Sequence, residues 1–357
     1  MSKKHIRKNI HPLAIHLGVA ASNEWSVPAA LSQANIAQKK LETMVKGIQM
    51  YQQSDYIVKR PETEMIWQQE GVTLSCLKGA EHKKNQETIL LVPSLINKAY
   101  ILNLTHNCSM LKYFTENGFN TYMLSWKEFD AQHSQTTTEM LVSEQLLPAI
   151  EYLYQHNNAR INTLGYCMGG TLLQANSDKI EALVNKTVLL AAPWDFHHSK
   201  FNLTKRVRTW APSILPLIKE RGILPSNWIQ ALFATIDPKG SGEKFIRFSQ
   251  MNQNSEQAKL FIAVEDWLND PVNIPGPVAQ SCIEKWFIEN MLIRRANHTN
   301  KILIMASHKD KLVPYESAIV ARGSNTDVIA AKTGHIGLIA GKKAQADVWY
   351  PILKWLK

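Results

Sequence analysis

A cysteine flanked by glycines is the residue of this sequence best suited to chemistry. Cys167 stands between Gly165 and Gly169 in the pattern Gly-x-Cys-x-Gly, directly after the short apolar segment Ile161–Tyr166. Glycines at these positions let a strand turn sharply into a helix, because a β-carbon would clash where the chain doubles back. The pattern therefore predicts a nucleophile at the apex of the turn. The alternative is a small buried apolar residue, which is the usual state of a free cysteine.

A thiol nucleophile needs a base to take its proton and an acid to orient that base. In enzymes built on such a turn, the acid and then the histidine follow the nucleophile in the chain, each after a strand. Asp310 follows the predicted strand Ile302–Ala306, and His335 lies in a glycine-flanked loop after the last predicted strand. The sequence thus predicts a triad of Cys167, His335 and Asp310. A solvated loop carboxylate is the alternative for Asp310, and His308 is the closest rival histidine.

Acyl transfer through a tetrahedral intermediate also needs two backbone N–H groups that bind the oxyanion. One is expected from Met168, which directly follows the cysteine. The other is expected from the loop after the predicted strand Ile89–Val92, near Leu95. Preorganised donors of this kind lower a barrier by about 3 kcal/mol each.

A cysteine in place of the usual serine favours exchange between thioesters. Transfer of an acyl group from a coenzyme A thioester to a thiol is close to thermoneutral, so the acyl group stays reactive toward an alcohol. A neighbouring imidazolium also lowers the pKa of a thiol well below about 8.5. The motif therefore predicts an acyltransferase that forms a covalent acyl-cysteine, more than a simple esterase.

The predicted elements around these residues alternate between strands and helices. Strands are predicted at Thr88–Pro93, Phe119–Leu124, Ile161–Tyr166, Thr187–Ala192, Lys301–Ala306 and Val328–Ala331, after a hairpin around Glu70-Gly71. Helices are predicted at Tyr100–Asn117, Thr138–Tyr154, Met168–Asp178 and Lys342–Trp355. Repeated strand–helix units indicate a mostly parallel sheet with helices on both faces. The predicted fold class is α/β, in the form of the α/β-hydrolase fold with an inserted helical cap.

The hydrophobic periodicity divides the chain into four segments. Residues 1–59 form an N-terminal leader with helical spacing over Leu31–Gln52. Residues 60–193 carry the first part of the core. The alternation stops over residues 194–299, which predicts a cap or lid, and resumes over residues 300–357 as the second part of the core.

The composition of the 357 residues, 45% hydrophobic and 20% charged, is that of a globular protein with an ample core. The formal net charge of +10 is spread along the chain without a recognisable nucleic-acid module, so nucleic-acid binding is not expected. Four scattered cysteines without C-x-x-C spacing predict neither a metal site nor a disulfide framework. A signal peptide and an apolar run of about 18 residues are both absent from the sequence, which predicts a cytoplasmic protein without a transmembrane segment.

Several segments together resemble the polyhydroxyalkanoate synthase family. The segment Leu91–Leu102 is similar to the family's V-P-P-x-I-N-K-x-Y-I-L motif, and Gly165–Thr171 matches its cysteine lipase box. Further correspondences are Ala192–Phe196, Asn269-Asp270 with Ile274–Pro277, Asp310–Pro314 and Gly334–Ile336. They follow the family order from about Pro61 to Lys357.

The resemblance implies an acyltransferase that polymerises (R)-3-hydroxyacyl groups, typically 3-hydroxybutyrate, from coenzyme A thioesters and releases coenzyme A. Cys167 would carry the growing chain and His335 would be the general base, with Asp310 orienting it or activating the incoming 3-hydroxyl. Substrate contacts would come from Tyr166, Trp267, Asn269 and Asp270. Family members use no metal and no cofactor besides the thioester substrate. They work as dimers at the surface of polyester granules, and two-subunit forms need an accessory protein.

The sequence departs from the family pattern in two motifs. Lys311 stands where the family's acid is usually followed by histidine, and the cap motif W-N-x-D appears as Trp267–Asp270 with its register altered. The length is nearer to that of the two-subunit forms. One alternative is a cysteine hydrolase on the same fold, either an acyl-CoA thioesterase or a depolymerase-like enzyme. The other is a non-catalytic granule-binding protein that uses the leader helix and the cap for association.

Overall fold

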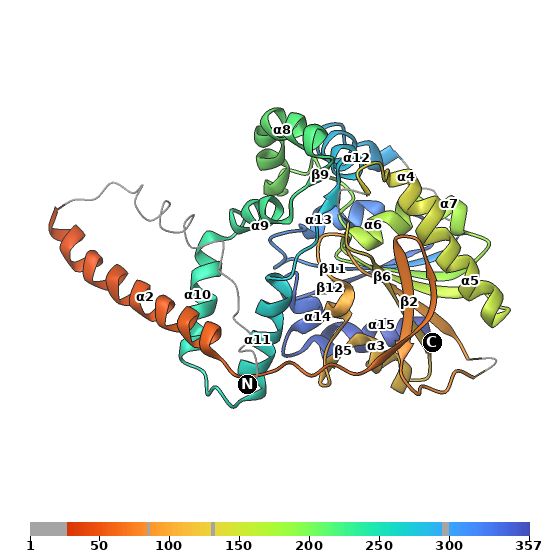
Figure 1. The fold of residues 1–357 in the computed structure, drawn as a ribbon, viewed down its shortest axis with the longest axis horizontal. Helices are drawn as coiled ribbons and strands as arrows, with labels where there is room; N and C mark the ends of the chain where they lie inside the picture. Colours follow the sequence, from red (N-terminus) through yellow and green to blue (C-terminus); the bar gives the residue numbers. More distant parts are fainter. Residues whose placement is uncertain (1–26, 84–85, 130–132, 295–299) are drawn as a thin grey trace. The chain divides into compact units, whose positions relative to one another are not determined.

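The computed structural model describes residues 27–83, 86–129, 133–294 and 300–357 (Figure 1). The contacts divide the chain into two compact units. Among the described residues, the smaller unit combines residues 27–59 with residues 227–270, and the larger unit combines those of 60–226 with those of 271–357. All strands of the central sheet belong to the larger unit.

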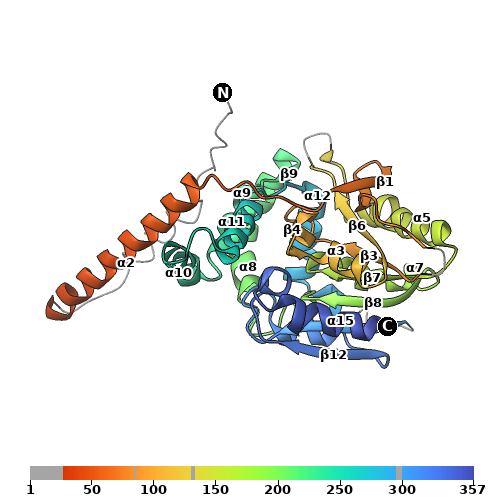
Figure 2. The same cartoon turned by 90° about the horizontal axis from the view of Figure 1, so that it is seen from below.

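The described part of the larger unit contains an eight-stranded sheet in the order β1-β2-β6-β3-β7-β8-β11-β12 (Figure 2). Its strands are β1 (Thr63–Gln69), β2 (Val72–Leu77), β3 (Thr88–Val92), β6 (Asn120–Trp126), β7 (Ile161–Tyr166), β8 (Val184–Leu190), β11 (Lys301–Ser307) and β12 (Thr326–Ala331). The pairs β1–β2 and β2–β6 are antiparallel, and every pair from β6 to β12 is parallel. Numbered along the chain, these strands run in the order 1-2-4-3-5-6-7-8. The predicted mostly parallel sheet is confirmed.

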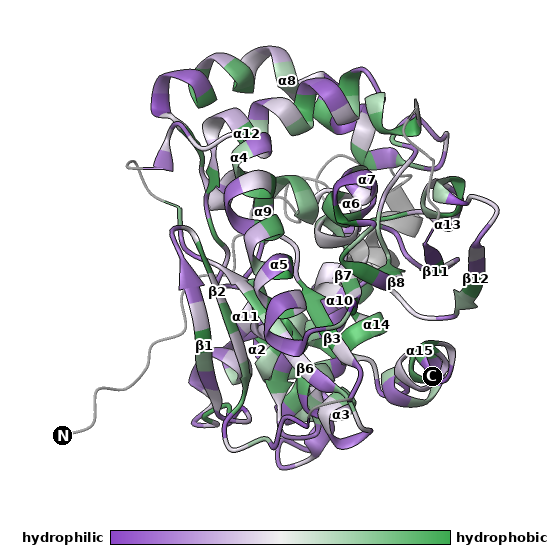
Figure 3. Cartoon of the chain, turned by 90° about the vertical axis from the view of Figure 1, so that its right-hand side faces the viewer, coloured by the Kyte–Doolittle hydropathy of each residue, from purple (hydrophilic) through white to green (hydrophobic). Residues whose placement is uncertain are grey.

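The burial of the strands follows from their place in the sheet. β3 and β7 are buried along their whole length, as expected of parallel strands that are covered on both faces. Hydrophobic residues accordingly line β3 and β8 in Figure 3. β2 instead alternates between buried and half-buried residues, which is typical of a strand with one open face. The predicted hairpin turn at Glu70-Gly71 is also present, with Gly71 at a φ of 80°.

Helices cover both faces of the sheet. They are α3 (Met110–Glu116), α4 (Thr138–Met140), α5 (Leu147–Asn157), α6 (Met168–Ala175), α7 (Ser177–Ile180), α13 (Tyr315–Ala318), α14 (Gly337–Ala340) and α15 (Tyr350–Leu356). Figure 1 shows α5 and α6 on one side of the sheet and α14 and α15 on the other. α3 packs beside the C-terminal helices through the rings of Tyr113 and Trp349, whose centroids lie 5.4 Å apart.

The predicted helix over Tyr100–Asn117 is wrong in its first half. The chain there forms a 3-10 turn over Ala99–Leu102 and then the short antiparallel strands β4 (Asn103–Thr105) and β5 (Cys108–Ser109). The hydroxyl of Ser109 donates to the side chain of Asn103 at 2.7 Å and accepts from a backbone N–H of α3. Side chains of this type compete with the helix for backbone groups and favour its start, so the helix begins only after Ser109.

A helical insertion separates β8 from β11. It comprises α8 (Asn202–Arg221), β9 (Ile223–Leu224), α9 (Ser226–Ala234), α10 (Pro238–Ser249), α11 (Glu256–Leu268), β10 (Ile274–Pro275), α12 (Gly276–Ser281), a π-helical turn at Cys282–Ile288 and a 3-10 turn at Met291–Arg294. The contacts divide this insertion differently from the predicted cap, because residues 227–270 group with the leader and its remainder groups with the sheet. Sequence periodicity marks where an insertion begins and ends, but it does not show which elements share a core.

The smaller unit has an apolar core of its own. Its leader helix α2 (Val27–Gln53) packs on α10. The hydroxyl of Tyr51 in α2 donates to the carboxylate of Asp266 in α11 at 2.9 Å. The core residues are Met44, Ile48, Tyr51, Phe245, Phe248, Ala258 and Ile262. An ion pair between Lys244 and the buried Glu265, at 2.7 Å, lies between α10 and α11. The leader is thus helical over most of its described length and forms one compact body with these two helices.

The length and composition of the helices bear on the predicted absence of a transmembrane segment. Within the ranges that the structure describes, no helix combines the length and the apolar composition needed to cross a bilayer. Residues 1–26 of the predicted leader lie outside these ranges.

Candidate active site

The segment around Cys167 forms the predicted sharp turn. β7 ends at Tyr166 and α6 begins at Met168, so Cys167 is the single residue between strand and helix. Its backbone has a φ of 53° and a ψ of −123°, a conformation that L-residues rarely adopt. The N–H of Cys167 donates to the carbonyl of Leu190 on β8 at 2.9 Å, which fixes the turn to the sheet.

Three glycines permit this turn, because a β-carbon at each of these positions would lie too close to a neighbouring atom. A β-carbon on Gly165 would lie 2.5 Å from the backbone nitrogen of Gly170. One on Gly169 would lie 2.5 Å from the carbonyl oxygen of Pro93, in the loop after β3. One on Gly170 would lie 2.7 Å from the β-carbon of Ala192, after β8. Sequence reasoning explained the first two glycines and missed the third.

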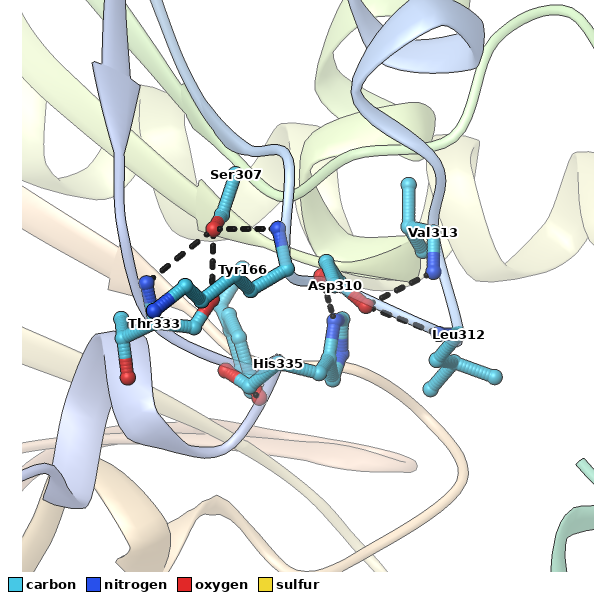
Figure 4. Close-up of polar contacts among 8 residues, drawn as sticks. Tyr166, Ser307, Asp310, Leu312, Val313, Thr333 and His335 are labelled. Atoms are coloured by element: carbon cyan, nitrogen blue, oxygen red, sulfur yellow. Dashed lines mark hydrogen bonds and ion pairs between the residues drawn. The ribbon is translucent and has the colours of Figure 1, made fainter. Parts of the chain in front are cut away.

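Asp310 and His335 are brought together at the carboxyl ends of neighbouring strands. Asp310 follows β11 and His335 follows β12, and the Nδ1–H of His335 donates to Oδ2 of Asp310 at 2.7 Å (Figure 4). The other carboxylate oxygen accepts from the N–H groups of Leu312 and Val313 at 2.8 and 2.9 Å. Asp310 is therefore a buried carboxylate whose two oxygens are both engaged, rather than the solvated loop acid of the alternative interpretation.

A serine that the sequence analysis missed joins the two loops. The hydroxyl of Ser307, the last residue of β11, donates to the carbonyl of Thr333 at 2.5 Å. It accepts from the N–H of Thr333 and from that of Lys309, each at 3.2 Å (Figure 4). These bonds hold the loop that carries Asp310 against the loop that carries His335. The available signal was a polar residue at the end of a strand that is buried after its first residue.

The ring of His335 lies between two groups that favour its protonated form. Burial by itself lowers the pKa of this histidine. The charges of Asp310 and Cys167 and hydrogen bonds to both side chains outweigh burial, so the pKa is raised to about 10. Because Nδ1 donates to Asp310, the interaction with the thiol falls to Nε2. The pKa of His335 thus depends on both neighbours, the carboxylate of Asp310 and the sulfur of Cys167.

The other three cysteines lie in surroundings that raise the pKa of their thiols. Burial raises the pKa of Cys76 to about 11, with a further contribution from Glu64. Burial also raises the pKa of Cys108 and of Cys282 to about 12 each. These thiols stay protonated near neutral pH, so they act as small apolar residues.

The two predicted oxyanion donors, Met168 and Leu95, lie at the start of α6 and in the loop after β3. Met168 is the first residue of α6, where backbone N–H groups have no partner within the helix. Leu95 is fully buried in the loop after β3. That loop is held by a bridge between Asn97 and Pro271 and by a bond from the N–H of Val272 to the carbonyl of Ile96 at 3.3 Å. Oxyanion binding by Met168 and Leu95 remains a prediction.

The predicted substrate residues fall in two places. Tyr166 is buried in the larger unit and its ring stacks on that of His335. Trp267, Asn269 and Asp270 belong to the smaller unit, where Trp267 is buried. The Nδ2 of Asn269 donates to the hydroxyl of Tyr51 at 3.3 Å and so links α11 to α2. Contacts of these residues with a substrate remain predictions.

Two further residues of the acid loop were singled out from the sequence. Lys311, which stands where the family has histidine, is exposed. The ring of His308 packs on that of Tyr315, with centroids 3.9 Å apart. It is His335, rather than His308, that contacts the carboxylate of Asp310.

The described residues contain no cluster of three or more histidine, cysteine or acidic side chains suited to a metal ion. The chemistry that this arrangement supports is that of a thiol, an imidazole and a carboxylate in series.

The comparison with known proteins gives distant relatives over nearly the whole chain. A poly(3-hydroxyalkanoate) polymerase subunit PhaC from Haloarcula marismortui is 24% identical over 343 residues, covering 91% of this chain and 72% of that protein. The PhaC subunit from Synechocystis sp. is 22% identical over 340 residues, covering 89% of this chain and 90% of that protein. The chain is a divergent relative of the poly(3-hydroxyalkanoate) polymerases. The resemblance predicted from the motifs is confirmed.

Two other comparisons bear on the family and the fold. No protein-family model matches the chain. A solved structure of a candidate lipase from Acinetobacter baumannii matches with a TM-score of 0.51 at 15% identity, covering 94% of this chain and 98% of that one. At this identity the likeness concerns the fold alone. Together with the strand order, it confirms the predicted α/β-hydrolase fold of this polymerase relative.

The turn itself provides a test of packing. The substitution Gly169→Ala introduces a β-carbon against the carbonyl groups after β3, which cannot move away without disturbing the sheet. We expect a loss of about 1–3 kcal/mol in the free energy of unfolding, measured by urea denaturation. Gly334→Ala is the matched control, because the nearest atom to its β-carbon is 4.0 Å away. Equal stability of the two variants would contradict this description of the turn.

The carboxylate provides a test of charge. Since Asp310 helps to raise the pKa of His335 above its ordinary value, Asp310→Asn lets the ring lose its proton at lower pH. We expect the rate of Cys167 alkylation by iodoacetamide to fall about tenfold or more near pH 6.5 and to approach the wild-type rate near pH 9.5. Peptide mass spectrometry identifies the alkylated cysteine. Asp327→Asn, which removes an exposed carboxylate from β12, should leave the profile unchanged. A wild-type profile in Asp310→Asn would refute the charge effect.

Proposed function

We propose that this chain is an acyltransferase that polymerises (R)-3-hydroxyacyl groups from coenzyme A thioesters and releases coenzyme A. The relatives named as poly(3-hydroxyalkanoate) polymerase subunits align with about nine-tenths of the chain, which supports the same activity for this protein. The observation that carries it is the imidazole of His335, bonded to Asp310 on one side and interacting with a thiol on the other. A thiol at this turn conserves the energy of a thioester, which polymerisation requires and hydrolysis does not.

Acylation begins with the thiolate of Cys167. Its sulfur attacks the thioester carbonyl of the hydroxyacyl-coenzyme A, and the negative charge moves to the carbonyl oxygen. The N–H groups of Met168 and Leu95 are the proposed donors to that oxyanion. Collapse of the intermediate breaks the bond to the sulfur of coenzyme A, which leaves as a thiol after taking the proton of His335. The products are an acyl-cysteine and a neutral imidazole.

Transfer to the next unit uses the imidazole as a base. His335 takes the proton of the 3-hydroxyl of a second hydroxyacyl-coenzyme A, whose oxygen attacks the acyl-cysteine. The bond to sulfur breaks, the thiolate and the imidazolium form again, and the product is a coenzyme A thioester one unit longer. This thioester acylates Cys167 in turn, so each added unit releases one molecule of coenzyme A. The buried carboxylate of Asp310 stabilises the imidazolium in both halves of the cycle.

The proposal includes the surroundings that the family resemblance implies. The protein works as a dimer at the surface of a polyester granule, without a metal or a separate cofactor. An accessory synthase subunit is a further expected partner. The proposal also requires a site that limits the access of water, because an acyl-cysteine that meets water before an alcohol is lost to hydrolysis.

Incubation with (R)-3-hydroxybutyryl-coenzyme A tests the proposed reaction. We expect release of coenzyme A together with formation of a polyester of high mass. Thiol titration measures the released coenzyme A, and mass measurement identifies the polyester. Cys167→Ala should reduce the rate by at least about 10³-fold, because it removes the nucleophile. Cys282→Ala is the matched control, since burial keeps that thiol protonated.

The products separate the alternatives. Monomeric 3-hydroxybutyrate as the sole product would replace the polymerase by a hydrolase on the same fold. No release of coenzyme A in the presence of the expected accessory subunit, with full cellular function of Cys167→Ala, would indicate a non-catalytic granule protein.

A further inference from the structure

We propose that Tyr166 is a positioning residue that holds the imidazole of His335 in line with the thiol of Cys167. The inference rests on the proposed roles of Cys167 and His335 and adds a third member that acts through the histidine. Tyr166 is the last residue of β7 and directly precedes the cysteine. One strand end therefore carries both the sulfur and a ring that lies against the base.

Tyr166 contacts His335 in two ways. The two rings are stacked, with centroids 5.1 Å apart and an interplanar angle of 28°. The phenol hydroxyl donates to the main-chain carbonyl of His335 at 3.3 Å (Figure 4). The first contact restrains the plane of the imidazole, and the second restrains the loop from which it projects.

The stack supplies a constraint that the carboxylate cannot. The covalent bond at Cγ and the hydrogen bond from Nδ1 to Asp310 hold one edge of the imidazole, and coupled rotation about χ1 and χ2 can still move the opposite edge. Such rotation would carry Nε2 away from the sulfur of Cys167. Packing against the face of Tyr166 opposes this motion, as the surroundings of a functional histidine generally determine its orientation.

The surroundings of Tyr166 suit this role. Its side chain is 2% exposed, so most of its surface packs against the protein. The substrate contact expected from the sequence stays a prediction. Burial and the charges of Cys167 and Asp310 raise the pKa of Tyr166 well above the ordinary value. The phenol therefore remains neutral and remains a donor over the range in which the thiol and the imidazole exchange protons.

Two substitutions separate the ring from the hydroxyl. Tyr166→Phe keeps a planar ring and removes the hydroxyl, whereas Tyr166→Met roughly keeps the volume and removes the ring. The rate of Cys167 alkylation by iodoacetamide is measured from about pH 5.5 to 9.5 in each variant. We expect Tyr166→Phe to keep the wild-type ratio of the rates near pH 6.5 and 9 within about threefold. Tyr166→Met should lower that ratio about tenfold, because the imidazolium is no longer held beside the sulfur.

Tyr122 offers a matched control in the same sheet. It is a fully buried tyrosine of β6, and its hydroxyl has no hydrogen-bond partner in the part of the chain that the structure describes. Tyr122→Phe and Tyr122→Met should both keep the wild-type profile. A change in Tyr122→Met as large as in Tyr166→Met would overturn the proposal, because the effect would then be one of general packing.

The decisive comparison is between the folded variants. A Tyr166→Met protein with a wild-type melting temperature and a wild-type alkylation profile would overturn the proposal. Should Tyr166→Met fail to fold, Tyr166→Leu replaces it, and Tyr166→His tests whether another planar ring restores the profile. The assay needs no acyl substrate. Failure of the wild-type protein to form polymer, with the alkylation results as expected, would therefore refute the proposed function and leave the positioning role in place.

Discussion

The bond between the Asp310 carboxylate and the His335 ring is the interaction on which the candidate site depends. A buried carboxylate is costly unless its lone pairs are satisfied, and here two backbone N–H groups and the ring N–H satisfy them. The charges of the carboxylate and of the neighbouring sulfur, with hydrogen bonds to both, outweigh the burial of the ring and raise the pKa of His335 to about 10.

The fold makes this series possible by bringing together the ends of strands that are distant in sequence. The turn after β7 presents Cys167, while the loops after β11 and β12 carry Asp310 and His335. The approach of these segments is tight enough that only glycine fits at positions 165, 169 and 170. The hydroxyl of Ser307 then fixes the separation of the two loops. The hydrogen bond from the N–H of Cys167 to the carbonyl of Leu190 on β8 helps to offset the strain of the backbone at Cys167.

Much of this arrangement could be predicted from the sequence. The alternating apolar segments gave the parallel strands, and the glycine spacing gave the turn, because both depend on local geometry that has a clear residue signature. The order of Cys167, Asp310 and His335 along the chain was enough to predict that Asp310 and His335 would meet. The part that sequence reasoning missed involves contacts between distant segments. Neither the stacking of Tyr166 on His335 nor the grouping of α2 with α10 and α11 has a local signature.

The central claim is that His335 is an imidazolium near neutral pH, and nuclear magnetic resonance of histidine-labelled protein tests it directly. The ring signals can be assigned with His335→Gln and followed from about pH 5.5 to 8.5. The structure, with the pKa of His335 raised to about 10, predicts that these signals keep the shifts of the protonated ring across that range. A titration step at or below about 6.5, the value of an unperturbed histidine, would contradict the account.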